Sequence, residues 1–344
     1  MSLDSVPDAI ATVREIARAS GRVVAPELQV ELISGGKSNL TYRVHNGDER
    51  WILRRPPLGD VVRGAHDVAR EYRVMSALGA TEFPVPETVG LLNPAPTIDR
   101  AAYLMAEVEG RVLRTRGDVE VLTVPARARL ADSLVRTLAM LHSLDPESVG
   151  LADLGRPDGF LQRQLERWSR QLAQVSDREL GGVSEIMTIL QKHLPIQSPA
   201  GIVHGDYRLD NVMVSDNDPS VIVAVLDWEM ATIGDPLADL GMLLMFWDEP
   251  GLSWNPITNG LMAFEGMPSA REAAEVYLLA RGLTGHTLAW YVLFAQFKLA
   301  VIMEQIAVRY RLGQTEGDGF DGVDSMPQTL LDQGLVTWNQ GRFS

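Results

Sequence analysis

The sequence predicts an α+β fold in two parts, a small antiparallel sheet followed by a larger, mainly helical part. Short strand-like segments separated by turns fill residues 28–108, and stretches with helical periodicity dominate from residue 118 onward. With 344 residues, of which 46% are hydrophobic, the chain has enough apolar material for two cores. We therefore divide it into residues 1–109 and 110–344, with Glu109-Gly110 as a short hinge.

The first part starts with a short helix and continues as an antiparallel meander, with a turn signal (His-Asn-Gly-Asp) at residues 45–48. A second helix has its apolar stripe on Val68, Tyr72 and Met75, and Glu71 falls inside this stripe. An acid on the buried face of a helix needs a partner, because burying a lone charge is costly. The predicted elements are a helix over 8–20, strands over 28–33, 40–44 and 51–53, a helix over 65–78 and a strand over 103–108.

The second part is predicted to be helical apart from one hairpin. Its strands cover 209–214 and 221–226, around the polar turn 215–220. The most apolar stretch runs from Leu288 to Ile302, but Gln296 and Lys298 interrupt it, so a buried helix is favoured over a membrane span. The predicted helices cover 126–141, 160–174, 181–193, 236–247, 270–281 and 286–312.

The composition limits the partners and the compartment. The net charge is −14, which argues against nucleic acid and anionic membranes as partners, because both require clustered Lys and Arg. The chain contains no cysteine, so disulfides and thiolate chemistry are excluded. Residues 1–10 lack the apolar core of a signal peptide, and we expect a cytoplasmic protein. The oligomeric state is left open, a homodimer included.

The densest group of chemically suggestive residues lies between residues 204 and 229. Asn211 opens the first strand of the predicted hairpin and Asp227 closes the second, so antiparallel pairing brings both to one end. Asp206 lies on the loop that leads into this end, and carboxylate and amide oxygens suit Mg²⁺. Each residue alone is an ordinary loop residue, but the joint spacing is that of the kinase catalytic loop and metal-binding aspartate. In these roles Asp206 orients the acceptor hydroxyl and takes its proton, while Asn211 and Asp227 hold magnesium on the ATP phosphates.

Together with residues 234–240 (Gly-Asp-Pro-Leu-Ala-Asp-Leu), this pattern resembles the aminoglycoside phosphotransferase (phosphotransferase enzyme) family, an atypical relative of protein kinases. The resemblance covers residues 28–310 and implies a protein-kinase-like, two-lobed fold. Residues 53–57, 65–74 and 207–211 are most similar to the branch fused to, or working beside, acyl-CoA dehydrogenases. Members that phosphorylate aminoglycosides more often carry His where this chain has Arg208. That departure weakens an antibiotic-resistance role and leaves the kinase chemistry untouched.

The resemblance also implies a phosphate-binding site in the first part. Kinases fold a flexible loop between two strands over the phosphates, and the matching residues here are Gly35, Gly36, Lys37, Ser38 and Asn39. Kinases use a lysine on the neighbouring strand; this chain offers Arg54, with Arg55 as the fallback. Arginine keeps its charge and can hold a phosphate with two donors. An ordinary turn and an ordinary exposed arginine are the alternatives.

Further roles follow from the same resemblance. Glu71 is expected to pair with the phosphate-binding cation, although a structural ion pair elsewhere is the alternative. The backbone of Ala106 and Val108 is expected to bind the adenine edge, unless residues 103–108 are only a core strand. Asp239 is expected to brace the catalytic loop, and His204 to bond to backbone instead of acting as a general base.

We therefore expect an ATP- and Mg²⁺-dependent phosphotransferase that moves the γ-phosphoryl group to a hydroxyl of a small molecule. A hydroxyacyl acid, its CoA thioester or another metabolic alcohol is the favoured acceptor. An aminoglycoside 3′-type kinase and a catalytically silent nucleotide-binding scaffold are the alternatives. An acidic acceptor pocket would suit polyamines, whereas Arg or Lys with apolar walls would suit acyl groups. Trp168, Trp290, Tyr291 and Phe294 either line that pocket or belong to the core.

Overall fold

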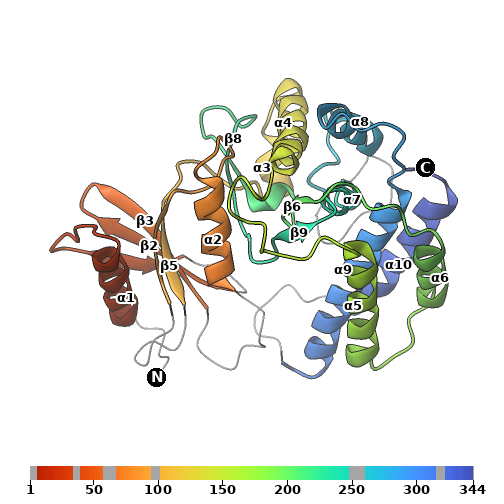
Figure 1. Cartoon of the computed structure of the whole chain (residues 1–344), viewed down its shortest axis with the longest axis horizontal. Helices are drawn as coiled ribbons and strands as arrows, with labels where there is room; N and C mark the ends of the chain where they lie inside the picture. Colours follow the sequence, from red (N-terminus) through yellow and green to blue (C-terminus); the bar gives the residue numbers. More distant parts are fainter. Residues whose placement is uncertain are drawn as a thin grey trace. The chain divides into compact units, whose positions relative to one another are not determined.

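The computed structural model describes residues 6–33, 39–56, 67–93, 101–247, 260–314 and 322–343. The chain divides into two compact units, whose elements are labelled in Figure 1. The first unit comprises residues 1–112, 149–151 and 211–231, and the second comprises 113–148, 152–210 and 232–344.

The first unit is built on a five-stranded antiparallel sheet with the order β1-β2-β3-β5-β4. Its strands are β1 (Gln29–Leu32), β2 (Leu40–Asn46), β3 (Glu49–Arg55), β4 (Thr88–Leu92) and β5 (Ala102–Ala106). The β2–β3 turn has Gly47 at φ +65°, a conformation that glycine adopts without steric cost. The predicted meander is confirmed. Strand β4 is absent from the sequence prediction, because prolines at positions 84 and 86 conceal its pattern.

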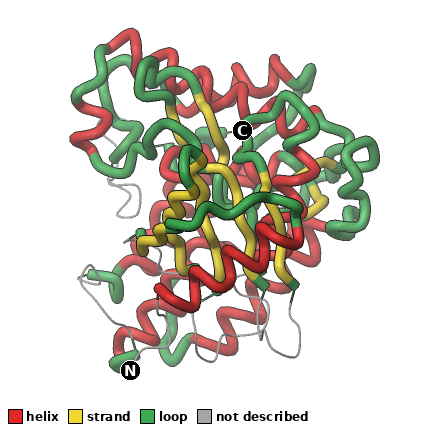
Figure 2. Tube along the Cα trace, turned by 90° about the vertical axis from the view of Figure 1, so that its left-hand side faces the viewer, coloured by secondary structure: helices red, strands yellow, loops and turns green. Residues whose placement is uncertain are grey.

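Helices α1 (Val6–Ala19) and α2 (Val68–Leu78) pack on this sheet. The side chains of β3 alternate between its two faces: Trp51 and Leu53 enter the core formed with α1, whereas Arg54 bonds to α2. Figure 2 views the sheet from the side on which α1 crosses the strands. The alternation therefore directs Trp51 and Leu53 to the core with α1 and Arg54 to the opposite face.

The hairpin of β7 (Val212–Val214) and β8 (Ile222–Val225) belongs to the first unit, whereas the predicted boundary at 109/110 assigns it to the second. Two backbone hydrogen bonds of 2.9 Å join Arg111 and Val214, and the Val225 amide donates to the Pro84 carbonyl at 2.9 Å. The predicted first strand is too long, because Leu209–Asn211 forms a 3₁₀ turn.

The second unit is mainly helical, and its longest helix, α9, packs against α5, α6, α7 and α10. By length and composition α9 could cross a membrane, but 78% of its most apolar window is buried, as expected for a core helix. The short elements α3, β6 and β9, and the last helix α10, are absent from the sequence prediction. The elements are α3 (Arg116–Glu120), α4 (Val124–Ser143), α5 (Phe160–Val175), α6 (Val183–Lys192), β6 (Gly201–Val203), β9 (Thr232–Gly234), α7 (Leu237–Met245), α8 (Ala270–Ala280), α9 (Ala289–Arg311) and α10 (Met326–Asn339).

Candidate active site

An ion pair between β3 and α2 forms the centre of the candidate site in the first unit. Arg54 Nη1 donates to Glu71 Oε1 at 2.6 Å, and the Glu71 side chain is only 1% exposed. The neighbouring Arg55 bonds instead to Asp8 and Tyr42, so its guanidinium is committed elsewhere. The predicted ion pair of Glu71 is therefore present, and its partner is Arg54 and not Arg55. The phosphate-binding role of Arg54 stays a prediction.

The electrostatics around Glu71 are dominated by burial and by neighbouring acids. Desolvation raises the pKa of Glu71 to about 7; Asp227 and Glu229 act in the same direction, and Arg54 opposes them. Burial disfavours the charged form of Arg54, but the surrounding negative charges outweigh it and raise the pKa of Arg54. The acidic side chains of Asp227 and Glu229 thus act on both members of the Arg54–Glu71 pair.

The hairpin end holds the two predicted magnesium ligands. Val212 pairs with Val225, and the Leu226 amide donates to the Asn211 carbonyl at 2.9 Å, so Asn211 and Asp227 lie at the same end as predicted. Asp227 is the one non-glycine residue with positive φ (67°) among those that the structure describes. Such backbone is strained for most residues and is often found at functional sites.

Asp227 Oδ1 and Glu71 Oε2 are among the buried oxygens of this unit that have no hydrogen-bond partner in the described part of the chain. Buried carboxylate oxygens without donors are costly, and a divalent cation near Asp227 would offset that cost. No group of three or more His, Asp or Glu side chains in the described ranges is arranged to hold a metal ion. These oxygens fit a Mg²⁺ ion that also takes ligands from a bound phosphate.

The other predicted nucleotide-binding residues are only partly visible. Gly35, Gly36, Lys37 and Ser38 lie outside the described residues. Asn39 is buried at the start of β2, and neither of its amide atoms has a hydrogen-bond partner in the described part of the chain. Ala106 ends β5, and Val108 follows it two residues later; both are half-buried. Their adenine contacts stay a prediction.

The loop that carries Asp206 lies in the second unit, where Asp239 of α7 holds its backbone. The Asp239 carboxylate accepts hydrogen bonds from the amides of His204 (2.5 Å) and Gly205 (2.8 Å). His204 is fully buried, and its Nδ1 accepts from the Asp206 amide at 3.2 Å. Asp239 and His204 thus make the backbone contacts predicted for them.

The Asp206 carboxylate is 29% exposed and therefore reachable from solvent. Arg208 Nε lies 3.3 Å from Asp206 Oδ2, and Arg208 Nη1 lies 2.6 Å from Asp210 Oδ2. Burial raises the pKa of Asp210, while Arg208 opposes the shift. Arg208 therefore bridges two carboxylates on one short segment.

Two residues of this region, His142 and Lys298, were not predicted as site residues. His142 Nε2 bonds to Asp239 at 3.2 Å and its Nδ1 to the Tyr277 hydroxyl at 2.6 Å; burial lowers the pKa of His142. No sequence motif marks His142 as a site residue. Lys298 donates to the Gly205 carbonyl at 2.8 Å. Lys298 could have been recognised from its position inside the most apolar stretch of the chain, because a buried lysine needs a partner.

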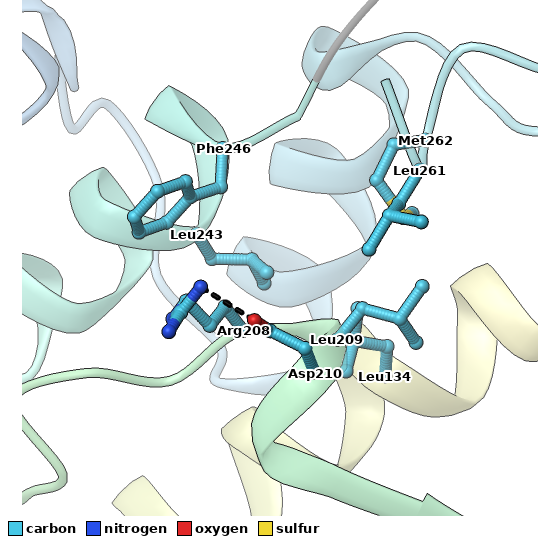
Figure 3. A pocket seen from close by; sticks show the side chains of 8 residues that line it. All are labelled: Leu134, Arg208, Leu209, Asp210, Leu243, Phe246, Leu261 and Met262. Carbon is cyan, nitrogen blue, oxygen red and sulfur yellow. Dashed lines mark hydrogen bonds and ion pairs between the residues drawn. The ribbon is translucent and has the colours of Figure 1, made fainter. Parts of the chain in front are cut away.

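A small pocket in the second unit lies beside the Arg208–Asp210 ion pair (Figure 3). The Arg208 guanidinium also lies 5.4 Å from the centroid of the Phe246 ring, within cation–π range. Trp168, Trp290, Tyr291 and Phe294 do not line this pocket. Its walls are mostly apolar and are formed by Leu134, Arg208, Leu209, Asp210, Leu243, Phe246, Leu261 and Met262.

Comparisons with known proteins agree with this arrangement. The model of the phosphotransferase enzyme family matches residues 29–272. Acyl-CoA dehydrogenase family member 11 of Gallus gallus is 33% identical over 327 residues, which cover 93% of this chain and 42% of that protein. The chain thus spans about two fifths of the length of this relative.

Solved structures share the fold over nearly the whole chain. A Ralstonia eutropha protein provisionally assigned as an aminoglycoside phosphotransferase has a TM-score of 0.82 at 28% identity and covers 97% of this chain and 98% of its own. Choline kinase of Cryptosporidium parvum has a TM-score of 0.65 at 14% identity, with 98% and 97% covered. The aminoglycoside phosphotransferase APH(4)-Ia, in a ternary complex with ADP and hygromycin B, has a TM-score of 0.61 at 13% identity, with 93% and 96% covered. The chain therefore belongs to the phosphotransferase enzyme family and has its kinase-like α+β fold.

Proposed function

We propose that this chain is a cytoplasmic, ATP- and Mg²⁺-dependent phosphotransferase that transfers the γ-phosphoryl group to a hydroxyl of a small molecule. The observation that carries the proposal is the charged cluster of the first unit. It combines the Arg54–Glu71 pair with one buried oxygen each of Glu71 and Asp227 for which the described residues provide no hydrogen-bond donor. A Mg²⁺ ion held at Asp227 would supply positive charge to this acidic cluster, and the phosphates of a bound nucleotide would supply further oxygen ligands. The ADP complex of the structurally similar APH(4)-Ia supports a nucleotide ligand.

Each residue has a defined task in this mechanism. Asp227 and the side-chain oxygen of Asn211 hold the magnesium ion, which when bound neutralises charge on the transferring phosphoryl group. Arg54, held in place by Glu71, contacts the phosphates with its fixed donor geometry. Asp206 orients the acceptor hydroxyl and takes its proton as the oxygen attacks phosphorus. The backbone of Ala106 and Val108 binds the adenine edge.

Catalysis in this scheme comes from positioning and charge neutralisation, because phosphoryl transfer needs little covalent chemistry from the protein. Asp206 suits the task of a base because its carboxylate is accessible while its backbone is fixed through His204 and Asp239. A catalytically silent scaffold has no need for such a combination. The enzyme is therefore favoured over the scaffold.

The pocket beside Asp210 is small and could contact only part of an acceptor, and its walls suit an apolar part. Most of its walls are aliphatic or aromatic, and its one acidic side chain is already paired with Arg208. A polycationic aminoglycoside needs several free carboxylates, whereas an acyl chain needs apolar walls. The similarity to a protein named acyl-CoA dehydrogenase family member 11 also supports an acceptor that contains an acyl group. We therefore favour hydroxyacyl acids, their CoA thioesters or related metabolic alcohols over aminoglycosides.

The proposal is tested by assaying the purified chain with Mg²⁺·ATP against hydroxy acids, hydroxyacyl-CoAs, aminoglycosides and choline-like alcohols. ADP release and the phosphorylated product are both measured, by a coupled assay and by mass spectrometry. We expect a phosphate ester with a hydroxyacyl compound, no product without Mg²⁺ and none from an acceptor that lacks the hydroxyl. Nucleotide binding without product from any acceptor would support the scaffold, and efficient turnover of an aminoglycoside would overturn the acceptor assignment.

A further inference from the structure

Lys298 is a buried lysine that the mechanism above does not use. It lies on α9, is 8% exposed, and its Nζ donates to the Gly205 carbonyl at 2.8 Å. The ammonium also lies 5.6 Å from the centroid of the Trp168 ring. Burial lowers the pKa of Lys298, and the negative charges of Asp206 and Asp239 oppose that shift. A lysine in so apolar a helix is costly, and its contacts are directed at the loop that carries Asp206.

The bond from Lys298 acts on the peptide unit that leads into Asp206. The Gly205 carbonyl and the Asp206 amide belong to one planar peptide, so fixing both groups fixes the orientation of the whole unit. Lys298 binds the carbonyl, and His204 Nδ1 accepts from the amide at 3.2 Å. Gly205 has φ +88°, a conformation that most other residues avoid. This peptide is therefore clamped from both of its polar ends.

Asp239 cannot replace this contact. Its carboxylate holds the amides of His204 and Gly205, which precede the clamped carbonyl in the chain. Carboxylates accept hydrogen bonds and cannot donate one to a carbonyl when ionised. Lys298 thus provides the donor at the last carbonyl before Asp206, and it brings a positive charge close to two acids.

We propose that Lys298 is a positioning residue for phosphoryl transfer: it clamps the Gly205–Asp206 peptide and thereby sets the direction of the Asp206 carboxylate. The proposal rests on the proposed function, because it takes Asp206 as the catalytic carboxylate. Lys298 itself touches neither the nucleotide nor the acceptor in this scheme. Its loss reduces kcat and leaves the Michaelis constant for ATP unchanged, since small displacements of a catalytic group cost up to ~100-fold in rate.

The test compares Lys298→Met, which removes the donor and the charge, with Lys298→Arg, which keeps both. Gln296→Met is the matched control, because Gln296 lies on the same helix, is 7% exposed and faces Gly334 of α10. We measure kcat and both Michaelis constants with an acceptor that the wild type phosphorylates. Hydrogen exchange of the amides of residues 204–206 is followed in parallel.

We expect Lys298→Met to lower kcat by about 100-fold with an ATP Michaelis constant within about twofold, and to speed amide exchange at residues 204–206. Lys298→Arg should recover at least about tenfold of the lost kcat, and Gln296→Met should change kcat by less than about threefold. If Lys298→Met does not fold, Lys298→Gln, which keeps a neutral donor, takes its place with the same expected direction.

Three results overturn the proposal: a kcat within about threefold of wild type, an equal loss in Gln296→Met, or unchanged amide exchange in the 204–206 segment. Absence of any transfer by the wild type would refute the proposed function instead. The exchange measurement does not depend on activity, so it still tests the clamp in that case.

Discussion

The two units hold their functional carboxylates in opposite ways. In the first unit, Glu71 and Asp227 each have a buried oxygen without a donor among the described residues, and the backbone at Asp227 adopts an unusual φ. In the second unit, the loop before Asp206 is held by Asp239, which accepts from the amides of His204 and Gly205, and by Lys298, which donates to the Gly205 carbonyl. Under the proposed function the first cluster binds Mg²⁺ and nucleotide, whereas the loop before Asp206 is held by side chains of the protein itself. Removing the ligand should affect the first far more than the second.

The largest expected effect concerns the chemical step in the second unit. Asp206→Asn should lower kcat by about 1,000-fold, because the amide cannot accept the acceptor's proton. Nucleotide affinity should stay unchanged, because the change leaves the first unit intact. Steady-state kinetics and nucleotide titration check both parts. Turnover within about tenfold of the wild type would remove Asp206 from the base role.

The next effect concerns the pH dependence of stability in the ligand-free protein. The pKa of Glu71 is raised to about 7, so the folded state holds a proton that the unfolded state releases near pH 4.5. The free energy of unfolding should therefore fall as pH rises from about 4.5 to about 7, by up to about 3 kcal/mol.

Urea unfolding of the wild type and Glu71→Gln across this pH range measures that fall as a difference between the two proteins. Glu87→Gln is the control, because Glu87 is exposed and its ion pair with Arg22 contributes little. If the free energy of unfolding changed with pH in the same way in the wild type and in Glu71→Gln, the pKa of Glu71 would not be raised in the folded protein.

A somewhat smaller effect is expected at the hairpin end. Asp227→Asn should lower kcat/KM by about 100-fold and raise the Mg²⁺ concentration needed for half-maximal rate. Asparagine tolerates positive φ, so the backbone conformation is retained. Asp216→Asn, an exposed acid on the same hairpin that pairs with Arg111, should behave as wild type. An unchanged Mg²⁺ requirement in Asp227→Asn would contradict the assignment of this ligand.

The smallest effect is expected at Tyr277, whose hydroxyl bonds to His142, the side chain that in turn bonds to Asp239. Tyr277→Phe removes the hydroxyl that bonds to His142 at 2.6 Å, and should lower the free energy of unfolding by about 1 kcal/mol. The loop keeps its direct bonds to Asp239, so kcat should change by less than about threefold. Denaturant unfolding and steady-state kinetics check this. A loss of kcat without a loss of stability would mean that Tyr277 acts on the reaction itself.

Much of the fold was predictable because its elements have local patterns. The β1–β3 meander followed from alternation and an Asn-Gly turn. The need of Glu71 for a partner followed from its place on an apolar stripe, while the resemblance to kinases pointed to Arg54 as that partner. Strand β4 and the docking of the β7–β8 hairpin were not predictable, because backbone bonds between distant segments, such as Val225 to Pro84, create them. The same holds for His142 and Lys298, whose partners lie 97 and 93 residues away.

The central claim is that the first unit binds Mg²⁺·ATP and the second unit supplies the base Asp206. It is tested most directly by calorimetric titration of Mg²⁺·ATP into the wild type, Asp206→Asn and Asp227→Asn. The wild type and Asp206→Asn should bind with dissociation constants within about twofold, and Asp227→Asn should bind at least about tenfold more weakly. Equal weakening by both substitutions, or no binding to the wild type, would contradict the account.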